Sequence, residues 1–165
     1  MDKSKKTHNI ILYGIGGQGT LKASEICAQA AFLEGYHVKK SEVHGMAQRG
    51  GSVESHLRFG KVVYSPIIPE FQADVLVCFY EGEHKRLKHF LKKGGIDLIS
   101  YLPKAHKFLK GNNRYLNTFM LGVLSCYMPI SKHCWLEAID IVFAGKFTKE
   151  NKDIFLQARK IGGER

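Results

Sequence analysis

The feature that most constrains this chain is a glycine-rich turn between an apolar run and a segment of helical periodicity. Residues 9–13 form a short apolar run, and the turn Gly14-Ile-Gly-Gly-Gln-Gly19 follows at once. From Thr20 onward, apolar residues recur at helical spacing until Gly35 ends the segment. A buried strand, a glycine turn and a helix in this order predict an α/β domain.

Strand-like and helix-like segments continue to alternate along the rest of the chain. We expect strands at 36–43, 52–59, 74–80 and 96–101, with Gly60-Lys61 turning a hairpin into residues 62–64. A basic helix is expected from about residue 82 to residue 92, ending at Gly94-Gly95, and the C-terminal third reads as three helices.

Nothing in the sequence marks a domain boundary, because repeats, low-complexity tracts and Pro/Ser-rich linkers are all missing. We therefore expect one domain over residues 1–165, with residues 1–8 as a disordered N-terminal tail. The predicted fold is α/β and Rossmann-like, in three layers. A mixed, mostly parallel sheet carries helices on both faces.

The glycine turn is a candidate anion-binding site. Glycines allow close backbone approach, and the following helix offers free N–H groups with positive partial charge. The turn fits the dinucleotide fingerprint GxGxxG, and Glu42 stands roughly where a dinucleotide site needs an acid. The alternative is that these glycines only pack the helix on the sheet. The candidate residues are Gly14, Gly16, Gly17, Gln18 and Gly19.

A second motif, His44-Gly-Met-Ala-Gln-Arg-Gly-Gly51, directly follows the second expected strand. The Arg49 guanidinium suits bidentate binding of a carboxylate or phosphate, and Gln48 adds orientable donors. Because loops after parallel strands meet at one sheet edge, we expect the two motifs to be neighbours. The alternative is an ordered turn with one surface arginine. The candidate interface or substrate-route residues are His44, Gly45, Gln48, Arg49, Gly50 and Gly51.

Secondary candidates are His56, Arg58 and Glu81. Alternation along 52–59 places His56 and Arg58 on one face with Glu54, which predicts a charged network or a partner-facing surface. Glu81 follows the most apolar strand and either faces the crevice or caps the next helix. No residue is assigned as catalytic.

The net charge of +10 comes from 25 basic and 15 acidic side chains, and much of the excess lies between residues 85 and 110. Such a segment suits an anionic cofactor or an acidic protein partner, or is a solvated helix face. Nucleic acid is not expected, because no aromatic ladder or helix-turn-helix signature accompanies the charge.

The four cysteines are scattered, which predicts neither a disulfide framework nor a metal site. No apolar run approaches the roughly 18–20 residues of a membrane span. The first residues also do not form a signal peptide, so no membrane association and a cytoplasmic location are expected.

Together, the two glycine-containing motifs closely resemble those of the gamma-type subunit of 2-oxoacid:ferredoxin oxidoreductases. The form His-Gly-Met-Ala-Gln-Arg-Gly-Gly is most similar to that of the indolepyruvate oxidoreductase beta subunit. The resemblance spans about residues 8–156, and it departs at Tyr80-Glu-Gly-Glu83, where the family has a Glu-Pro-type turn. Supporting matches are Ser52-Val53, His56, Arg58, Ser65-Pro66, Pro69, Asp74, Asn117, Met120-Leu-Gly122, Asn151 and Phe155.

The resemblance implies a multisubunit enzyme that oxidatively decarboxylates a 2-oxoacid to an acyl-CoA. In this family, thiamine diphosphate carries the carbanion chemistry, and iron–sulfur clusters pass electrons to ferredoxin. This chain lacks clustered cysteines and the Gly-Asp-Gly motif with paired asparagines that would hold Mg–thiamine diphosphate. We therefore expect no cofactor on this chain alone, larger partner subunits that bind the thiamine cofactor and clusters, and coenzyme A as a candidate co-substrate.

Two other functions fit the glycine turn. One is a stand-alone oxidoreductase that binds NAD(P) or FAD, and the other is a non-catalytic module that binds a nucleotide or coenzyme A. No catalytic constellation of the dehydrogenase kind follows the turn.

Overall fold

The computed structural model describes residues 6–45 and 50–164. Within these ranges one sheet has the strand order β2-β3-β1-β4-β5. β1 pairs in parallel with β4, and β4 with β5, whereas β3 pairs antiparallel with both β1 and β2. The strands are β1 His8–Ile15, β2 His37–His44, β3 Ser52–Gly60, β4 Ala73–Cys78 and β5 Leu91–Asp97.

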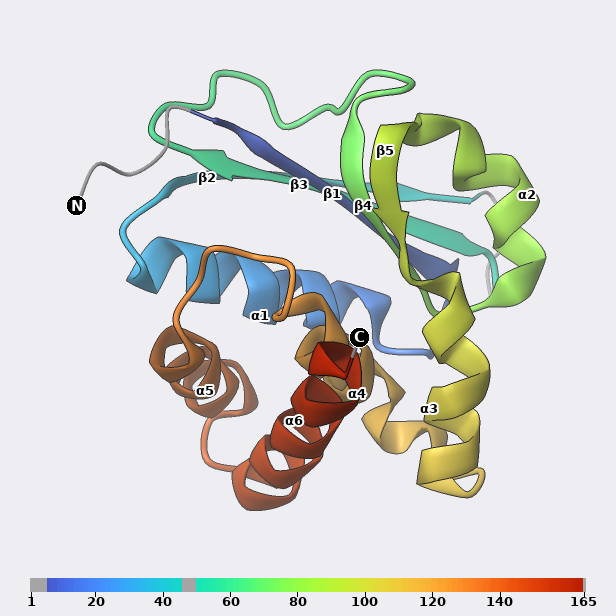
Figure 1. Ribbon diagram of the computed structural model, residues 1–165, viewed down its shortest axis with the longest axis vertical. Helices are drawn as coiled ribbons and strands as arrows, with labels where there is room; N and C mark the ends of the chain where they lie inside the picture. The colour runs from blue at the N-terminus through green and yellow to red at the C-terminus, as the bar shows by residue number, and fades with distance from the viewer. Residues whose placement is uncertain (1–5, 46–49, 165) are drawn as a thin grey trace.

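The longer helices all lie on one side of this sheet (Figure 1). α1 packs directly on β1, β2 and β3, α5 packs on α1, and α4 packs against α1, α3 and α6. The helices are α1 Thr20–Leu33, α2 His84–Leu87, α3 Leu102–Leu109, α4 Leu116–Leu124, α5 Lys132–Phe143 and α6 Thr148–Gly163. Short 3-10 turns occupy Glu81–Glu83, Lys88–Phe90, Leu98–Tyr101 and Asn113–Tyr115.

Helix α4 is the centre of the helical layer. Every one of its residues is buried, as expected for a helix that is apolar on all sides. It crosses α6 closely, with Gly122 on α4 against the backbone of α6 at Phe155. The largest buried side chain of this layer, Trp135 of α5, lies 5.8 Å from Phe155 between ring centroids.

Alternation along β3 separates the two sheet faces. Leu57 and Phe59 point to the side of α1, where Phe59 contacts the ring of Tyr36. His56 and Arg58 point to the other side, which is covered by the extended segment 61–72 and by the short helical segment 81–90. The predicted opposition of these two sets of β3 residues is confirmed.

The predicted α/β class and mixed sheet are confirmed, with differences in detail. The sheet is evenly mixed rather than mostly parallel, because the antiparallel β3 lies between β1 and β2. Helices on the face opposite α1 are confined to the short turns of 81–90.

Three local predictions are wrong. The helix expected over 82–92 is broken into short turns, and its glycines 94 and 95 lie within β5 instead of ending a helix. Residues 98–101 form a 3-10 turn rather than a strand. The hairpin strand expected at 62–64 is not formed. At the N-terminus β1 already begins at His8, and residues 1–5 of the expected tail lie outside the described residues.

Candidate functional site

The glycine turn and the end of the second motif meet at one sheet edge, as the sequence predicts. β1 delivers Gly14 and its successors to this edge, and β3 begins opposite them because Ser52 pairs with Ile15. The Gly16 N–H donates to the Gly51 carbonyl at 3.0 Å. Gly50 lies beside Gly16, since a Cβ built on Gly16 would be 3.6 Å from the Gly50 nitrogen. The glycines thus allow backbone to approach backbone.

Two glycines of the turn have a left-handed conformation, Gly17 at φ 87° and Gly19 at φ 77°. They differ in surroundings. A Cβ on Gly17 would meet nothing within 4 Å, whereas a Cβ on Gly19 would lie 2.8 Å from the Asn117 side-chain nitrogen. Asn117 is buried, and its Oδ1 accepts from the Thr118 N–H at 2.8 Å, which limits its movement. The first turn of α4 therefore supports the loop.

This contrast gives a testable pair of variants. We expect Gly19→Ala to destabilise the chain by about 2 kcal/mol, because left-handed strain adds to the clash with Asn117. Gly17→Ala incurs the strain alone, about 1 kcal/mol. Urea unfolding of both variants checks the order. Equal losses would contradict the role assigned to Asn117.

Two hollows flank the turn. The first has a volume of about 340 Å³ and the second about 420 Å³. The first is lined by Ile15, Gly16, Gly17, Gly19, Thr20, Leu21, Lys22 and Val53. The second is lined by Gln18, Phe79, Tyr80, Glu81, Leu102, Pro103 and His106.

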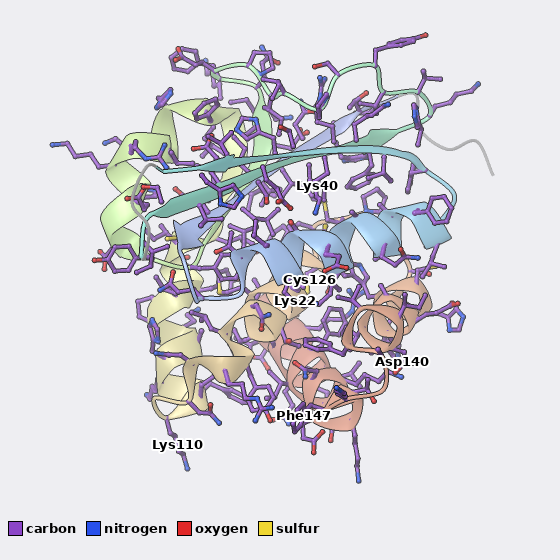
Figure 2. The ribbon with its side chains drawn as sticks, turned by 180° about the vertical axis from the view of Figure 1, so that it is seen from behind. Lys22, Lys40, Lys110, Cys126, Asp140 and Phe147 are labelled. Carbon is purple, nitrogen blue, oxygen red and sulfur yellow. The ribbon has the colours of Figure 1, made fainter. Side chains whose placement is uncertain are left out.

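The first hollow is electrostatically suited to an anion. It opens at the N-terminus of α1, whose first turn holds no acidic side chain and does hold Lys22 (Figure 2). Thr20 lines this hollow, and its buried hydroxyl has no hydrogen-bond partner among the described residues. The Gln18 side chain does not line this hollow but folds back on the turn, where its Oε1 accepts from the Ile15 N–H at 3.0 Å.

A dinucleotide site of the Rossmann kind is not supported by this geometry. Such a site has its acidic residue on the parallel strand next to β1, but here β3 lies between β1 and β2. Glu42 instead bonds to Lys40 Nζ at 2.7 Å on the same strand. Since the Gly16 N–H already donates to Gly51, one backbone donor of the turn is also occupied.

The secondary candidates belong to a buried polar network on the other face of the sheet. Ile68 N–H donates to His56 Nδ1 at 3.0 Å, so the ring proton is on Nε2, which donates to Glu54 Oε1 at 2.8 Å. Arg86 Nη1 donates to the other Glu54 oxygen at 2.9 Å. Arg58 donates to Asn9 and to two carbonyls of segment 61–72.

This network lowers the pKa of the Glu54 carboxyl. The hydrogen bond from His56 is the main cause, burial opposes it, and Arg86 adds to the lowering. His56 and Arg58 thus organise the far face of the sheet and do not reach the glycine turn.

The sequence-predicted residues are divided between several places. Gly50 and Gly51 lie beside the turn, whereas Gly45 contacts Ser52 from the β2 side of β3. His44 is exposed at the end of β2, with its Nε2 3.9 Å from Glu42 Oε2. Glu81 lines the second hollow. Gln48 and Arg49 lie outside the described residues. Sequence reasoning did not assign Thr20, Lys22 or Asn117 to the site.

Asn117 had a signal in the sequence, because it matches the family pattern. Thr20 and Lys22 had only their position in the first turn after the glycines.

Within residues 6–45 and 50–164, no group of three or more His, Cys, Asp or Glu side chains is placed to hold a metal ion. Cys27 and Cys78 are buried thiols on separate elements, and burial raises the pKa of both. Over the same residues, no helix has the length and apolar character needed to cross a membrane.

The sequence is similar to subunits of known oxidoreductases. It is 47% identical over 98 residues to the indolepyruvate oxidoreductase subunit IorB of Thermococcus kodakarensis, covering 59% of this chain and 48% of that protein. It is 30% identical over 154 residues to the ketoisovalerate oxidoreductase subunit VorA of Methanothermobacter marburgensis, covering 81% of this chain and 31% of that protein. The chain thus spans at most about half the length of these two relatives.

Solved structures share the fold. The gamma subunit of a keto/oxoacid ferredoxin oxidoreductase from Geobacter sulfurreducens matches 96% of this chain and 99% of its own, with a TM-score of 0.77 and 21% identity. The 2-oxoglutarate:ferredoxin oxidoreductase of Magnetococcus marinus, solved with 2-oxoglutarate, coenzyme A and succinyl-CoA bound, matches 98% of this chain over 32% of its own, with a TM-score of 0.83 and 20% identity.

The model of one family, pyruvate ferredoxin/flavodoxin oxidoreductase, matches residues 9–161, which is nearly the whole chain. This chain therefore belongs to the pyruvate ferredoxin/flavodoxin oxidoreductase family.

Proposed function

We propose that the chain is the small, gamma-type subunit of a multisubunit 2-oxoacid:ferredoxin oxidoreductase of the indolepyruvate type. The observation that carries this proposal is the family match over residues 9–161, together with 47% identity to IorB over 98 residues. The complex would oxidatively decarboxylate a 2-oxoacid to an acyl-CoA and pass the electrons to ferredoxin. The proposal keeps the cytoplasmic location expected from the sequence.

In this proposal the thiamine diphosphate, Mg and iron–sulfur clusters are bound by larger partner subunits. The scattered positions of the four cysteines, which offer no cluster-binding spacing, favour that division. The small subunit would contribute the glycine turn and the second motif to the contact with these partners. The free N–H groups of α1 favour an anionic ligand in the first hollow, such as a coenzyme A phosphate or a carboxylate. Lys22 borders this hollow, and its Nζ lies 3.4 Å from Glu25 Oε2 on the same helix.

The test is co-production of the chain with candidate larger subunits. We expect the purified complex to reduce a dye in the presence of an aryl pyruvate and coenzyme A, and the isolated chain to reduce none. Pyruvate and 2-oxoglutarate serve as comparison substrates. A complex that turns over no 2-oxoacid would contradict the proposal. Stoichiometric micromolar binding of NADH or FAD to the isolated chain would support the stand-alone oxidoreductase instead.

Arg49 gives the sharpest test of the second motif. We expect Arg49→Ala to lower turnover or complex yield roughly 10-fold or more, because a charge-assisted bidentate contact contributes about 1.5–3 kcal/mol. Arg49→Lys keeps the positive charge but loses the planar guanidinium group. Its turnover or complex yield should therefore lie between those of the wild type and Arg49→Ala. Unchanged turnover and unchanged yield in Arg49→Ala would remove Arg49 from the site.

A further inference from the structure

The extended segment 61–72 runs over the sheet face opposite the long helices (Figure 1). It carries large apolar side chains that are exposed. Tyr64 is 90% exposed, Phe71 61%, Ile67 49% and Val62 48%. We call segment 61–72, which carries these four side chains, the apolar strap. Single exposed apolar residues are common, but four within ten positions mark an interaction surface.

The strap is held in place by side chains from the sheet. Arg58 Nη1 donates to the Ser65 carbonyl at 3.0 Å and to the Ile67 carbonyl at 3.2 Å. The Ile68 N–H donates to His56 Nδ1, as described above. Arg58 and His56 are neighbouring outward positions of β3, so the strand itself fixes the path of the strap.

The opposite side of the segment provides anchors. Val63 and Ile68 are buried, at 3% and 1% exposure, between exposed neighbours. The Val63 N–H donates to His37 Nδ1 at 3.0 Å, which ties the segment to β2. A segment so held has little conformational entropy to lose when a partner binds.

The backbone of the segment is strained at Phe71. It has a left-handed conformation, φ 60°, which is unfavourable for a bulky residue, and it is mostly exposed. Its N–H donates to the His89 carbonyl at 3.1 Å, so the conformation is fixed by the neighbouring segment. Strain that projects an aromatic ring into solvent points to a contact outside the chain.

The charges around the strap indicate which kind of partner fits. Lys61 begins the segment, and Lys39 lies beside Arg58 in the register of β2 and β3. Within the segment the carboxylate is that of Glu70, which is exposed and lies 3.4 Å from His89 Nε2 through its Oε1. The neighbouring segment 81–90 on the same sheet face adds the exposed side chains of Lys85 and Lys88, so a second copy would place basic residues against basic residues.

We propose that the apolar strap docks a larger subunit of the complex, on an apolar patch bordered by aspartate or glutamate side chains. This inference rests on the proposed function, because it takes the partner from there. It adds a second contact surface, on the sheet face opposite α1 and separate from the edge of the glycine turn.

The test compares variants of the full chain in binding to the co-produced larger subunit. We expect Tyr64→Glu to weaken binding at least about 30-fold, because an exposed aromatic ring of this kind is a typical binding hot spot. The new carboxylate would lie in the apolar contact and would also be repelled by the acidic residues of the partner. Tyr64→Phe keeps the ring and should bind like the wild type. Phe32→Glu is the matched control, since Phe32 is also 65% exposed but lies at the end of α1, on the other side of the sheet.

The outcomes separate this inference from the proposed function. If the wild-type chain binds no larger subunit, the proposed function itself fails. If the wild type binds and Tyr64→Glu binds equally well, only the strap proposal is overturned. It is also overturned if the wild-type chain dimerises through this face and Tyr64→Glu makes it monomeric. Because Tyr64 is 90% exposed, the variant should keep the wild-type melting temperature, which excludes misfolding as the cause.

Discussion

Gly122→Ala is expected to destabilise the chain by about 3 kcal/mol, because it forces α4 and α6 apart. A Cβ at this position would lie 2.4 Å from the Phe155 carbonyl oxygen and 2.8 Å from the Ala158 Cβ. Both contacts are with the fixed body of α6, so no flexible side chain can move aside. The better helix propensity of alanine, about 1 kcal/mol, offsets only part of this cost.

Gly163→Ala is the matched control, because Gly163 is likewise a helical glycine, at the end of α6, and a Cβ there would meet nothing within 4 Å. Urea unfolding should show a large loss for Gly122→Ala and a change of less than about 0.5 kcal/mol for Gly163→Ala. Since α4 also carries Asn117 against Gly19, the first variant should disturb the glycine turn. Equal stabilities of the two variants would contradict the close crossing.

The strand–turn–helix unit and β3 could be predicted from the sequence because their signals are local. Apolar residues 9–13, the glycines and the helical spacing after Thr20 all indicate the same unit. The strict alternation along 52–59 predicts both faces of β3. The meeting of the two motifs followed from strand direction alone, because β1 and β2 both end at the same sheet edge.

Other elements depend on tertiary contacts that local patterns do not contain. Gly94 and Gly95 resemble a helix stop, yet they lie in β5, whose pairing with β4 has an irregular register. Residues 62–64 resemble a strand, but Val63 and Ile68 are buried singly and the segment bonds to side chains instead of a neighbouring strand. The antiparallel position of β3 between β1 and β2 is likewise a property of the whole sheet.

The candidate site shows the same division. The glycines could be found from the sequence, because a left-handed turn requires them. The support from Asn117 could not be derived from spacing, since α4 lies about a hundred residues further along. The strap was also missed, because the sequence predicts a hairpin strand at 62–64 and indicates no element for Ile67 and Phe71.

The buried network under the strap connects these observations and gives the second large effect. We expect Glu54→Ala to destabilise the chain by about 3 kcal/mol or more, because it leaves His56 buried with an unpartnered Nε2–H. Since His56 Nδ1 also accepts from Ile68, loss of its orientation should release the strap. Amide exchange at Ile68 should become faster than in the wild type, by more than the loss of global stability accounts for.

The effect of Glu54→Ala should depend on pH in a defined direction. Because the folded-state pKa of Glu54 lies below its ordinary value of 4.5, the carboxylate stabilises the fold above that value. This contribution is lost as the pH falls through the folded-state pKa. The stability difference between wild type and Glu54→Ala should therefore be largest near neutral pH and shrink in acid. A stability difference that does not change with pH would contradict a stabilising role of the ionised Glu54 carboxylate.

Arg86→Ala separates the two partners of Glu54. The Arg86 side chain is 48% exposed, so its pair with Glu54 is partly screened by water and should contribute less than about 1 kcal/mol. In Arg86→Ala, the His56 bond to Glu54 and the Ile68 bond to His56 both remain, so exchange at Ile68 should stay close to that of the wild type. If Arg86→Ala instead matches Glu54→Ala in both stability and exchange, the strap is held by the whole charge network and not by the orientation of His56.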